Sequence, residues 1–171
     1  MTPVNEAPPA LWCDCEVPFS CILQAEPVDT HAQMLLLQAI NQIESAHETE
    51  PVNADSRRLE RLEAKLDLTL FLLARTLEPS PPGPPHNVRL LPEGLIWQES
   101  SPASRPEPGA RVTLALRPST ALPLTLKLSA EVSEVRATEI QTSFTHLDED
   151  TLEAWHQLVF RRHRQAIRAR R

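Results

Sequence analysis

The chain has 171 residues, of which 41% are hydrophobic and 23% charged, a balance typical of one folded domain with an accessory element. It contains 17 prolines but only 3 glycines, which favours stiff connections over flexible ones. No apolar run reaches the roughly 18 residues needed to cross a bilayer, and the N-terminus lacks a basic start followed by an apolar segment. We therefore expect a cytoplasmic protein without membrane insertion.

The net charge of −6 conceals a basic C-terminus, because six arginines and no acid lie in residues 160–171. This separation favours pairing with acidic surface of the same chain, or binding of an external anion or acidic partner. The candidate residues are Arg161, Arg162, Arg164 and Arg168. Nucleic acid is not the expected partner, because only Phe160 could stack on a base there and the molecule is acidic overall.

Residues 1–28 form a proline-interrupted segment, in which residues 17–23 predict an edge strand. The segment also contains Cys13, Cys15 and Cys21. A structural zinc site needs about four ligands, and the nearest histidine, His31, is distant in sequence. We expect free thiols in a reducing compartment and no metal site.

Two helices are predicted next, and together they form a helical oligomerisation region at residues 29–78. The first begins at Asp29, a suitable N-cap, and fades near Glu48. The second covers about residues 55–77, and its first half is amphipathic whereas its second half is apolar nearly all round. A single helix in water would leave these leucines exposed, which is unfavourable. We therefore expect this helix to be buried against another copy, the rest of the chain, or both.

The second helix also fits a heptad repeat. With Leu59 at position a, the a and d positions are Leu59, Leu62, Leu66, Thr69 and Leu73. Arg58 then falls at g and Glu63 at e, the relation that favours a parallel interface between copies. Self-association is preferred over an intramolecular hairpin with the first helix, because further apolar residues, including Leu68 and Phe71, lie outside this seam.

Residues 79–86 form a proline-rich spacer, after which the apolar period changes from that of a helix to that of a strand. Strands are predicted on either side of a Pro-Glu-Gly turn at 92–94 and within residues 111–117, 122–132 and 135–144. A last helix begins near Asp148. It is acidic at its start and rich in arginine at its end, which complements the helix dipole. The elements indicate an antiparallel sheet or small barrel with a docked helix.

This order of elements resembles that of atypical PilZ-domain proteins, whose better-known relatives are bacterial receptors for cyclic di-GMP. The segments that carry the resemblance are LWCDCEVPF (11–19), RLEAKLDLTLFLLAR (61–75), VRLLPEGLIW (88–97), GARVTLAL (109–116), LPLTL (122–126) and VFRRHRQAI (159–167). The resemblance implies an α+β fold in which two long helices precede a six-stranded antiparallel β-barrel with a C-terminal helix, the barrel region covering residues 87–171. It also implies a homotetramer assembled through a parallel helical bundle.

Receptors of this family supply an Arg-x-x-x-Arg pair before the barrel and Asp/Asn-x-Ser-x-x-Gly on it, because arginine forks onto phosphate oxygens and guanine edges. Aligned on Gly94, this chain has Arg89 in place of Asp or Asn and Leu91 in place of Ser. The pair Arg57 and Arg61 lies on the solvated side of the heptad helix. The resemblance therefore predicts that the standard site is lost and that cyclic di-GMP is not a supported cofactor.

No motif of a hydrolase, metalloprotease or nucleotide-binding enzyme occurs, and we do not expect an enzyme. The function predicted is that of a non-enzymatic signalling or adaptor protein in cyclic di-GMP-linked bacterial regulation, with itself and an unidentified protein as partners. The alternative is a genuine cyclic di-GMP receptor that uses a non-standard arginine site built from Arg89 and the C-terminal arginines.

Overall fold

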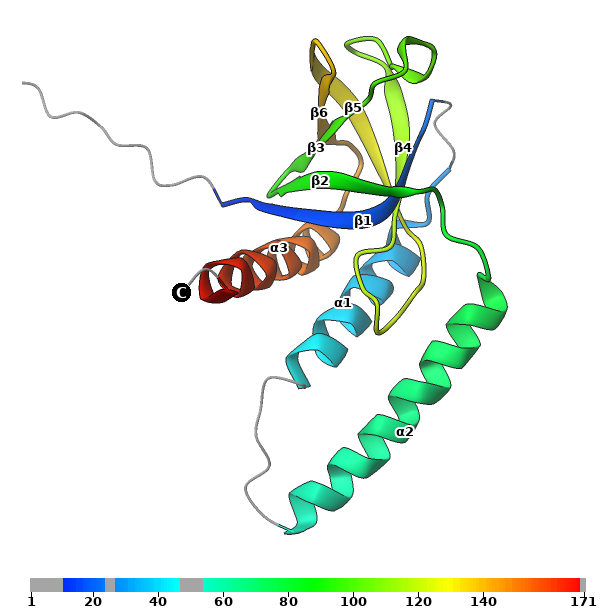
Figure 1. Cartoon of the computed structure of the whole chain (residues 1–171), viewed down its shortest axis with the longest axis vertical. Helices are drawn as coiled ribbons and strands as arrows, with labels where there is room; N and C mark the ends of the chain where they lie inside the picture. Colours follow the sequence, from blue (N-terminus) through cyan, green and yellow to red (C-terminus); the bar gives the residue numbers. More distant parts are fainter. Residues whose placement is uncertain (1–10, 24–26, 47–53, 170–171) are drawn as a thin grey trace, which may run out of the picture.

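A closed barrel of six antiparallel strands forms the centre of the molecule (Figure 1). The computed structural model describes residues 11–23, 27–46 and 54–169. The strands are β1 (Cys13–Ile22), β2 (Pro85–Leu91), β3 (Gly94–Gln98), β4 (Arg111–Leu116), β5 (Leu126–Arg136) and β6 (Glu139–Phe144). Their order around the barrel is β1-β2-β3-β6-β5-β4. The six-stranded barrel expected from the resemblance is thereby confirmed.

Strand β1 is longer and more central than the edge strand predicted at residues 17–23. It pairs with β2 from Cys13 to Pro18 and with β4 from Phe19 to Ile22, so both of its sides are used. Pro18 lies where the strand changes partner, a position at which a missing N–H interrupts no continuous ladder. The barrel thus includes a strand from the N-terminal segment and is not built from residues 87–171 alone.

The hairpin of β2 and β3 has the turn that the sequence predicted, with Pro92 and Glu93 between the paired residues Leu91 and Gly94. The strand predicted at 135–144 is wrong as a single element. A turn at residues 137–138 separates β5 from β6, and Ala137 adopts a positive φ of 51° there. Alanine is rare in this left-handed region, so nothing in the sequence marks the turn.

Helix α3 (Glu149–Ala169) closes one side of the barrel core. Trp155 is fully buried, and its indole Nε1 donates a hydrogen bond to the Leu91 carbonyl at 2.8 Å. The helix begins where predicted, because an Asp148 carboxylate oxygen accepts a hydrogen bond from the Thr151 amide at 2.7 Å. The hydrogen bonds from Thr151 also hold the pKa of Asp148 below its usual value.

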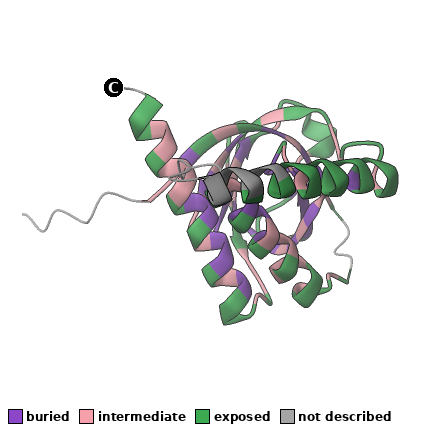
Figure 2. Cartoon of the chain, turned by 90° about the horizontal axis from the view of Figure 1, so that it is seen from below, coloured by how far each residue is buried: buried purple, intermediate pink, exposed green. Residues whose placement is uncertain are grey.

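Helix α1 (Thr30–Ala46) packs against α3 and β5, and its apolar residues Leu37, Ile40 and Ile43 are buried. Helix α2 (Ala54–Leu77) instead projects away from the barrel (Figure 1). Viewed from below, it is exposed along most of its described length (Figure 2). The apolar face of α1 is therefore used within the chain, whereas most of the leucines of α2 remain uncovered. Among the described residues, no helix is long and apolar enough to span a bilayer.

Candidate functional site

Helix α2 carries a continuous apolar surface that no other described part of the chain covers. Leu59, Leu62, Leu66 and Leu73 are each at least half exposed, and Thr69 and Glu63 are exposed beside them. The side chain of Arg58, the remaining member of the predicted seam, lies outside the described part. Contiguous apolar surface of this kind marks an interaction site, whereas single exposed leucines are ordinary. The heptad pairing itself stays a prediction.

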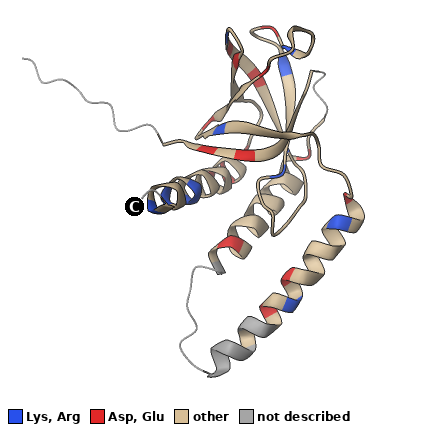
Figure 3. Cartoon of the chain, viewed as in Figure 1, with Lys and Arg blue, Asp and Glu red and all other residues tan. Residues whose placement is uncertain are grey.

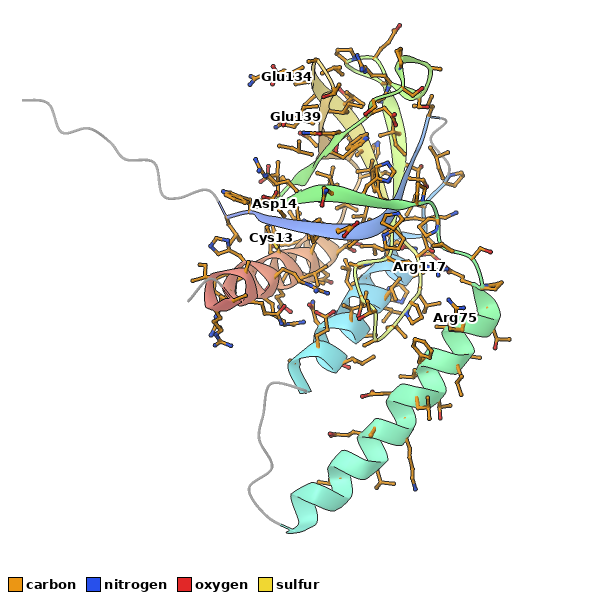
Figure 4. All side chains as sticks on the ribbon, in the orientation of Figure 1. Cys13, Asp14, Arg75, Arg117, Glu134 and Glu139 are labelled. Carbon is orange, nitrogen blue, oxygen red and sulfur yellow. The ribbon has the colours of Figure 1, made fainter. Side chains whose placement is uncertain are left out.

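A buried arginine fastens the end of α2 to the barrel (Figure 4). The side chain of Arg117, which follows β4, is only 5% exposed. Its Nη2 donates to the Glu78 carbonyl at 2.9 Å, to the Ser80 carbonyl at 2.5 Å and to a Glu78 carboxylate oxygen at 3.3 Å. Its Nε donates to the Thr125 hydroxyl at 3.3 Å. We call this group the Arg117 clamp, and it joins the last turn of α2 and the start of the proline spacer to one loop of the barrel.

The proline spacer is held against β1. A Cβ placed on Gly83 would lie 2.2 Å from the Phe19 carbonyl oxygen, so only glycine permits this approach. The Phe19 amide also donates a hydrogen bond to the Pro84 carbonyl at 3.1 Å. The spacer therefore behaves as a fixed arm, and the direction in which α2 leaves the barrel is set by the fold.

Arg89, aligned with a ligand-binding position, is held by contacts within the chain. Its Nε and Nη2 donate to the two carboxylate oxygens of Asp14 at 2.7 and 3.2 Å, and its guanidinium lies 4.5 Å from the centre of the Trp12 ring. The hydrogen bond that Arg89 donates to Asp14 raises the pKa of Arg89. An open cavity of about 370 Å³ is lined by Asp14, Arg89 and Glu139, among others. Asp14 and Glu139 are labelled in Figure 4. Two carboxylates among the lining residues make the cavity unfavourable for phosphate.

Gly94, the residue on which the family motif was aligned, has a structural role. A Cβ at this position would lie 1.9 Å from the Thr142 carbonyl oxygen, because β3 and β6 approach closely here. Leu91 is partly buried, and its carbonyl accepts the hydrogen bond of Trp155. The three aligned motif positions are thus occupied by residues that build the barrel.

Two of the four C-terminal candidate arginines are paired with α1. Arg161 donates to a Glu44 carboxylate oxygen at 3.4 Å and to Asn41 at 3.1 Å. Arg162 donates to the other Glu44 oxygen at 2.6 Å and to the Pro118 carbonyl at 2.7 Å. These arginines join α3 to α1 and to the loop after β4, which is the intramolecular pairing that the charge asymmetry predicted as one of its two outcomes.

The other two arginines, Arg164 and Arg168, are exposed at the basic end of α3 (Figure 3). Arg164 lies 5.7 Å from the centre of the Phe160 ring, and the three residues line a cavity of about 210 Å³. Arg89 lies in the other cavity, lined by a different set of residues. The two parts of the alternative arginine site are therefore divided between two surfaces.

Cys13, Cys15 and Cys21 form no disulfide bond. Burial raises the pKa of both Cys15 and Cys21 to about 12, so these thiols stay protonated at neutral pH. Within the described residues, no group of three His, Cys, Asp or Glu side chains is arranged to hold a metal ion.

Comparison with known proteins identifies the family. Residues 34–171 match the family model of the atypical PilZ domain, cyclic di-GMP receptor. A solved structure of a pathogenic protein from Xanthomonas campestris, described as a new tetrameric PilZ domain self-assembled via an unusual helical bundle, is similar with a TM-score of 0.74. The two chains are 25% identical, and the match covers 93% of this chain and 91% of the other. No curated protein matches. Because the family model spans most of the sequence, the chain belongs to the atypical PilZ-domain family.

Proposed function

We propose that this protein is a non-enzymatic signalling or adaptor protein that works as a homo-oligomer in cyclic di-GMP-linked bacterial regulation. The observation that carries the proposal is the row of exposed leucines on α2, including Leu59, Leu62, Leu66 and Leu73. Exposure of this apolar surface to water is unfavourable, and packing against a second copy of the helix would bury it. The tetrameric relative supports assembly through a helical bundle.

The proposal includes a degenerate cyclic di-GMP site. It is supported by the bidentate pairing of Arg89 with Asp14 and by the absence of a serine hydroxyl at Leu91. Signalling would then depend on contacts with a protein partner. A cytoplasmic location is also proposed, and it is supported by three cysteines that form no disulfide bond, because thiols stay reduced in reducing compartments.

The test of self-association is the mass in solution, measured by light scattering. The wild-type protein should have a multiple of the 19.2 kDa mass of one chain. Leu62→Glu with Leu66→Glu should yield monomers, because the new charges cannot be buried between helices. A matched control is Leu23→Glu with Leu35→Glu, two exposed leucines outside α2, which should leave the mass unchanged. A wild-type monomer would contradict the proposal.

The second candidate is a cyclic di-GMP receptor with a non-standard site, which the family description favours. The exposed Arg164 and Arg168 beside Phe160 are the residues that such a site would use. A ligand present at 100 times its Kd would raise the free energy of unfolding by about 2.7 kcal/mol. A receptor should therefore melt at a higher temperature with excess cyclic di-GMP, and Arg164→Ala with Arg168→Ala should remove the shift. The adaptor proposal predicts no shift in either protein.

A further inference from the structure

A groove runs from β6, past the turn between β2 and β3, to helix α3. Two neighbouring cavities form it, of about 400 and 450 Å³, and Leu11 and Pro92 line both of them. The second cavity is also lined by His156, Gln157 and Phe160 of α3, and Phe160 is 51% exposed. We call the two cavities the turn–helix groove, and Leu11, Pro92 and Phe160 give it an apolar centre.

Two hydrogen bonds from α3 fix the walls of the turn–helix groove. The indole Nε1 of Trp155 donates to the carbonyl of Leu91, at the start of the turn, at 2.8 Å. The Nδ1 of His163 lies 2.7 Å from the carbonyl oxygen of Trp12, beside the lining residue Leu11, and Nδ1 is the donor because a carbonyl has no proton. The walls are therefore held before any partner binds, and a preformed site loses less free energy to ordering.

The groove leads to the basic end of α3. A further cavity of about 210 Å³ shares Phe160 with the groove and is lined beyond it by Arg164 and Arg168. Spacings of four residues place these three side chains along one side of the helix, towards the basic end that Figure 3 shows. Among the described residues, neither arginine pairs with a carboxylate, in contrast to the two arginines that are paired with α1. Two uncompensated positive charges therefore lie beside the apolar centre.

We propose that the turn–helix groove binds an acidic peptide segment of a partner protein. An apolar side chain of that segment enters the cavity beside Phe160, and carboxylates that neighbour it in the peptide pair with Arg164 and Arg168. The inference rests on the proposed adaptor function, and it assigns a surface to the unidentified protein partner. In such an interface the desolvated apolar anchor contributes most of the affinity, and complementary charges add orientation and speed of association.

Charge complementarity selects an acidic occupant. The whole chain carries a net charge of −6, so an acidic segment is repelled by most of its surface and attracted to the end of α3. A free phosphate or nucleotide would pair with the arginines but leave Leu11 and Pro92 in water, whereas a peptide with an apolar anchor covers both parts.

The turn–helix groove is also separate from the exposed leucines of α2. No described residue of α2 lines any of the three cavities. Helix α2 and the end of α3 leave the barrel in different directions (Figure 1). Self-association through α2 therefore does not account for this surface.

Random peptides displayed on phage, selected on the purified full-length protein, provide the probe. Enriched sequences should combine a large apolar residue with neighbouring aspartate or glutamate. One enriched peptide is synthesised with a fluorophore, and its Kd is measured by fluorescence anisotropy. Phe160→Ala should weaken binding by about tenfold or more, and so should Arg164→Glu with Arg168→Glu. All three positions are exposed, and circular dichroism confirms that the variants are folded.

Each variant has a matched control outside the groove. Leu23→Ala removes an apolar side chain that is 48% exposed. Arg111→Glu with Arg136→Glu makes the same change in net charge at two exposed arginines of β4 and β5. Both controls should bind the peptide as the wild type does at an ionic strength of about 0.15 M, where distant charges are screened.

Three results would overturn the proposal: enriched peptides without acidic residues, a peptide that binds Phe160→Ala as tightly as the wild type, or a control that weakens binding as much as the groove variants. Displacement of the probe by a synthetic peptide of residues 1–10 would instead assign the groove to the chain's own N-terminal segment. A smaller light-scattering mass of Phe160→Ala would assign it to a second copy. All of these results are compatible with self-association through α2, whereas a monomeric wild type would refute the proposed function, so the two failures are distinguishable.

Discussion

Replacing Arg117 with methionine should loosen the junction between α2 and the barrel. Methionine keeps much of the aliphatic packing but removes the four hydrogen bonds of the Arg117 clamp, of which two go to backbone carbonyls and one to a carboxylate. Hydrogen bonds to charged groups contribute about 1.5–3 kcal/mol each, and neutral ones about 1. The Glu78 side chain is 38% exposed, so water can replace part of the loss. We expect the free energy of unfolding to fall by about 2–4 kcal/mol.

The measurement is urea denaturation, made in the Leu62→Glu, Leu66→Glu background so that assembly does not contribute to the apparent stability. The control is Arg136→Met, because Arg136 is 74% exposed and its ion pair with Glu134 should contribute nothing measurable. If Arg117→Met lost less than about 1 kcal/mol, or no more than the control, the clamp would not hold the helix as described.

Three further predictions concern the barrel. Gly94→Ala should lower the free energy of unfolding in urea by about 3 kcal/mol or more, because its Cβ would lie 1.9 Å from a carbonyl oxygen of β6. Gly109→Ala should lower it by about 1–2 kcal/mol, because Gly109 has a φ of 81° but open space around it. Equal losses in the two variants would contradict this reasoning. Trp155→Phe should lose about 1–3 kcal/mol, since it removes the hydrogen bond to Leu91 and leaves a small void, and an unchanged urea midpoint would argue against that bond. Cys15 and Cys21 are half-buried and should react with a thiol reagent more slowly in the native protein than after unfolding. Because folding raises their pKa to about 12, their contribution to stability is complete below pH ~8.5 and is lost as the pH rises towards 12. Equal rates for native and unfolded protein at about pH 8 would refute the raised pKa.

Much of the barrel could be predicted because alternate apolar residues point into it. Alternate residues of β5 are buried and the residues between them are not, as the period of two requires. The buried residues are Leu126, Leu128, Ala130 and Val132. Strand β1 was the least predictable, because its partners come after both long helices, and its residues Asp14, Glu16 and Pro18 are poor strand formers. Its role depends on closure of the barrel, which no local pattern encodes.

The candidate surface on α2 was predictable for a different reason, because the excess of leucine in this segment can be read from the sequence without knowing the fold. The residues that position it were not. Arg117 and Glu78 are 39 residues apart, and neither differs in sequence from an ordinary surface charge. The same holds for Glu44, which accepts from Arg161 and Arg162 more than 115 residues away. Ion pairs of this kind depend on tertiary structure, so sequence gives only the excess of charge and not the partner.

The pairing of β1 with β2 places both α1 and α2 inside one loop of chain. During synthesis, β1 leaves the ribosome first but must wait for β2 and β4, and closing so long a loop is slow. A single helix forms within about a microsecond. The leucines of α2 are therefore available to neighbouring nascent chains before any barrel has closed, and we expect assembly to begin on incompletely folded chains when expression is high.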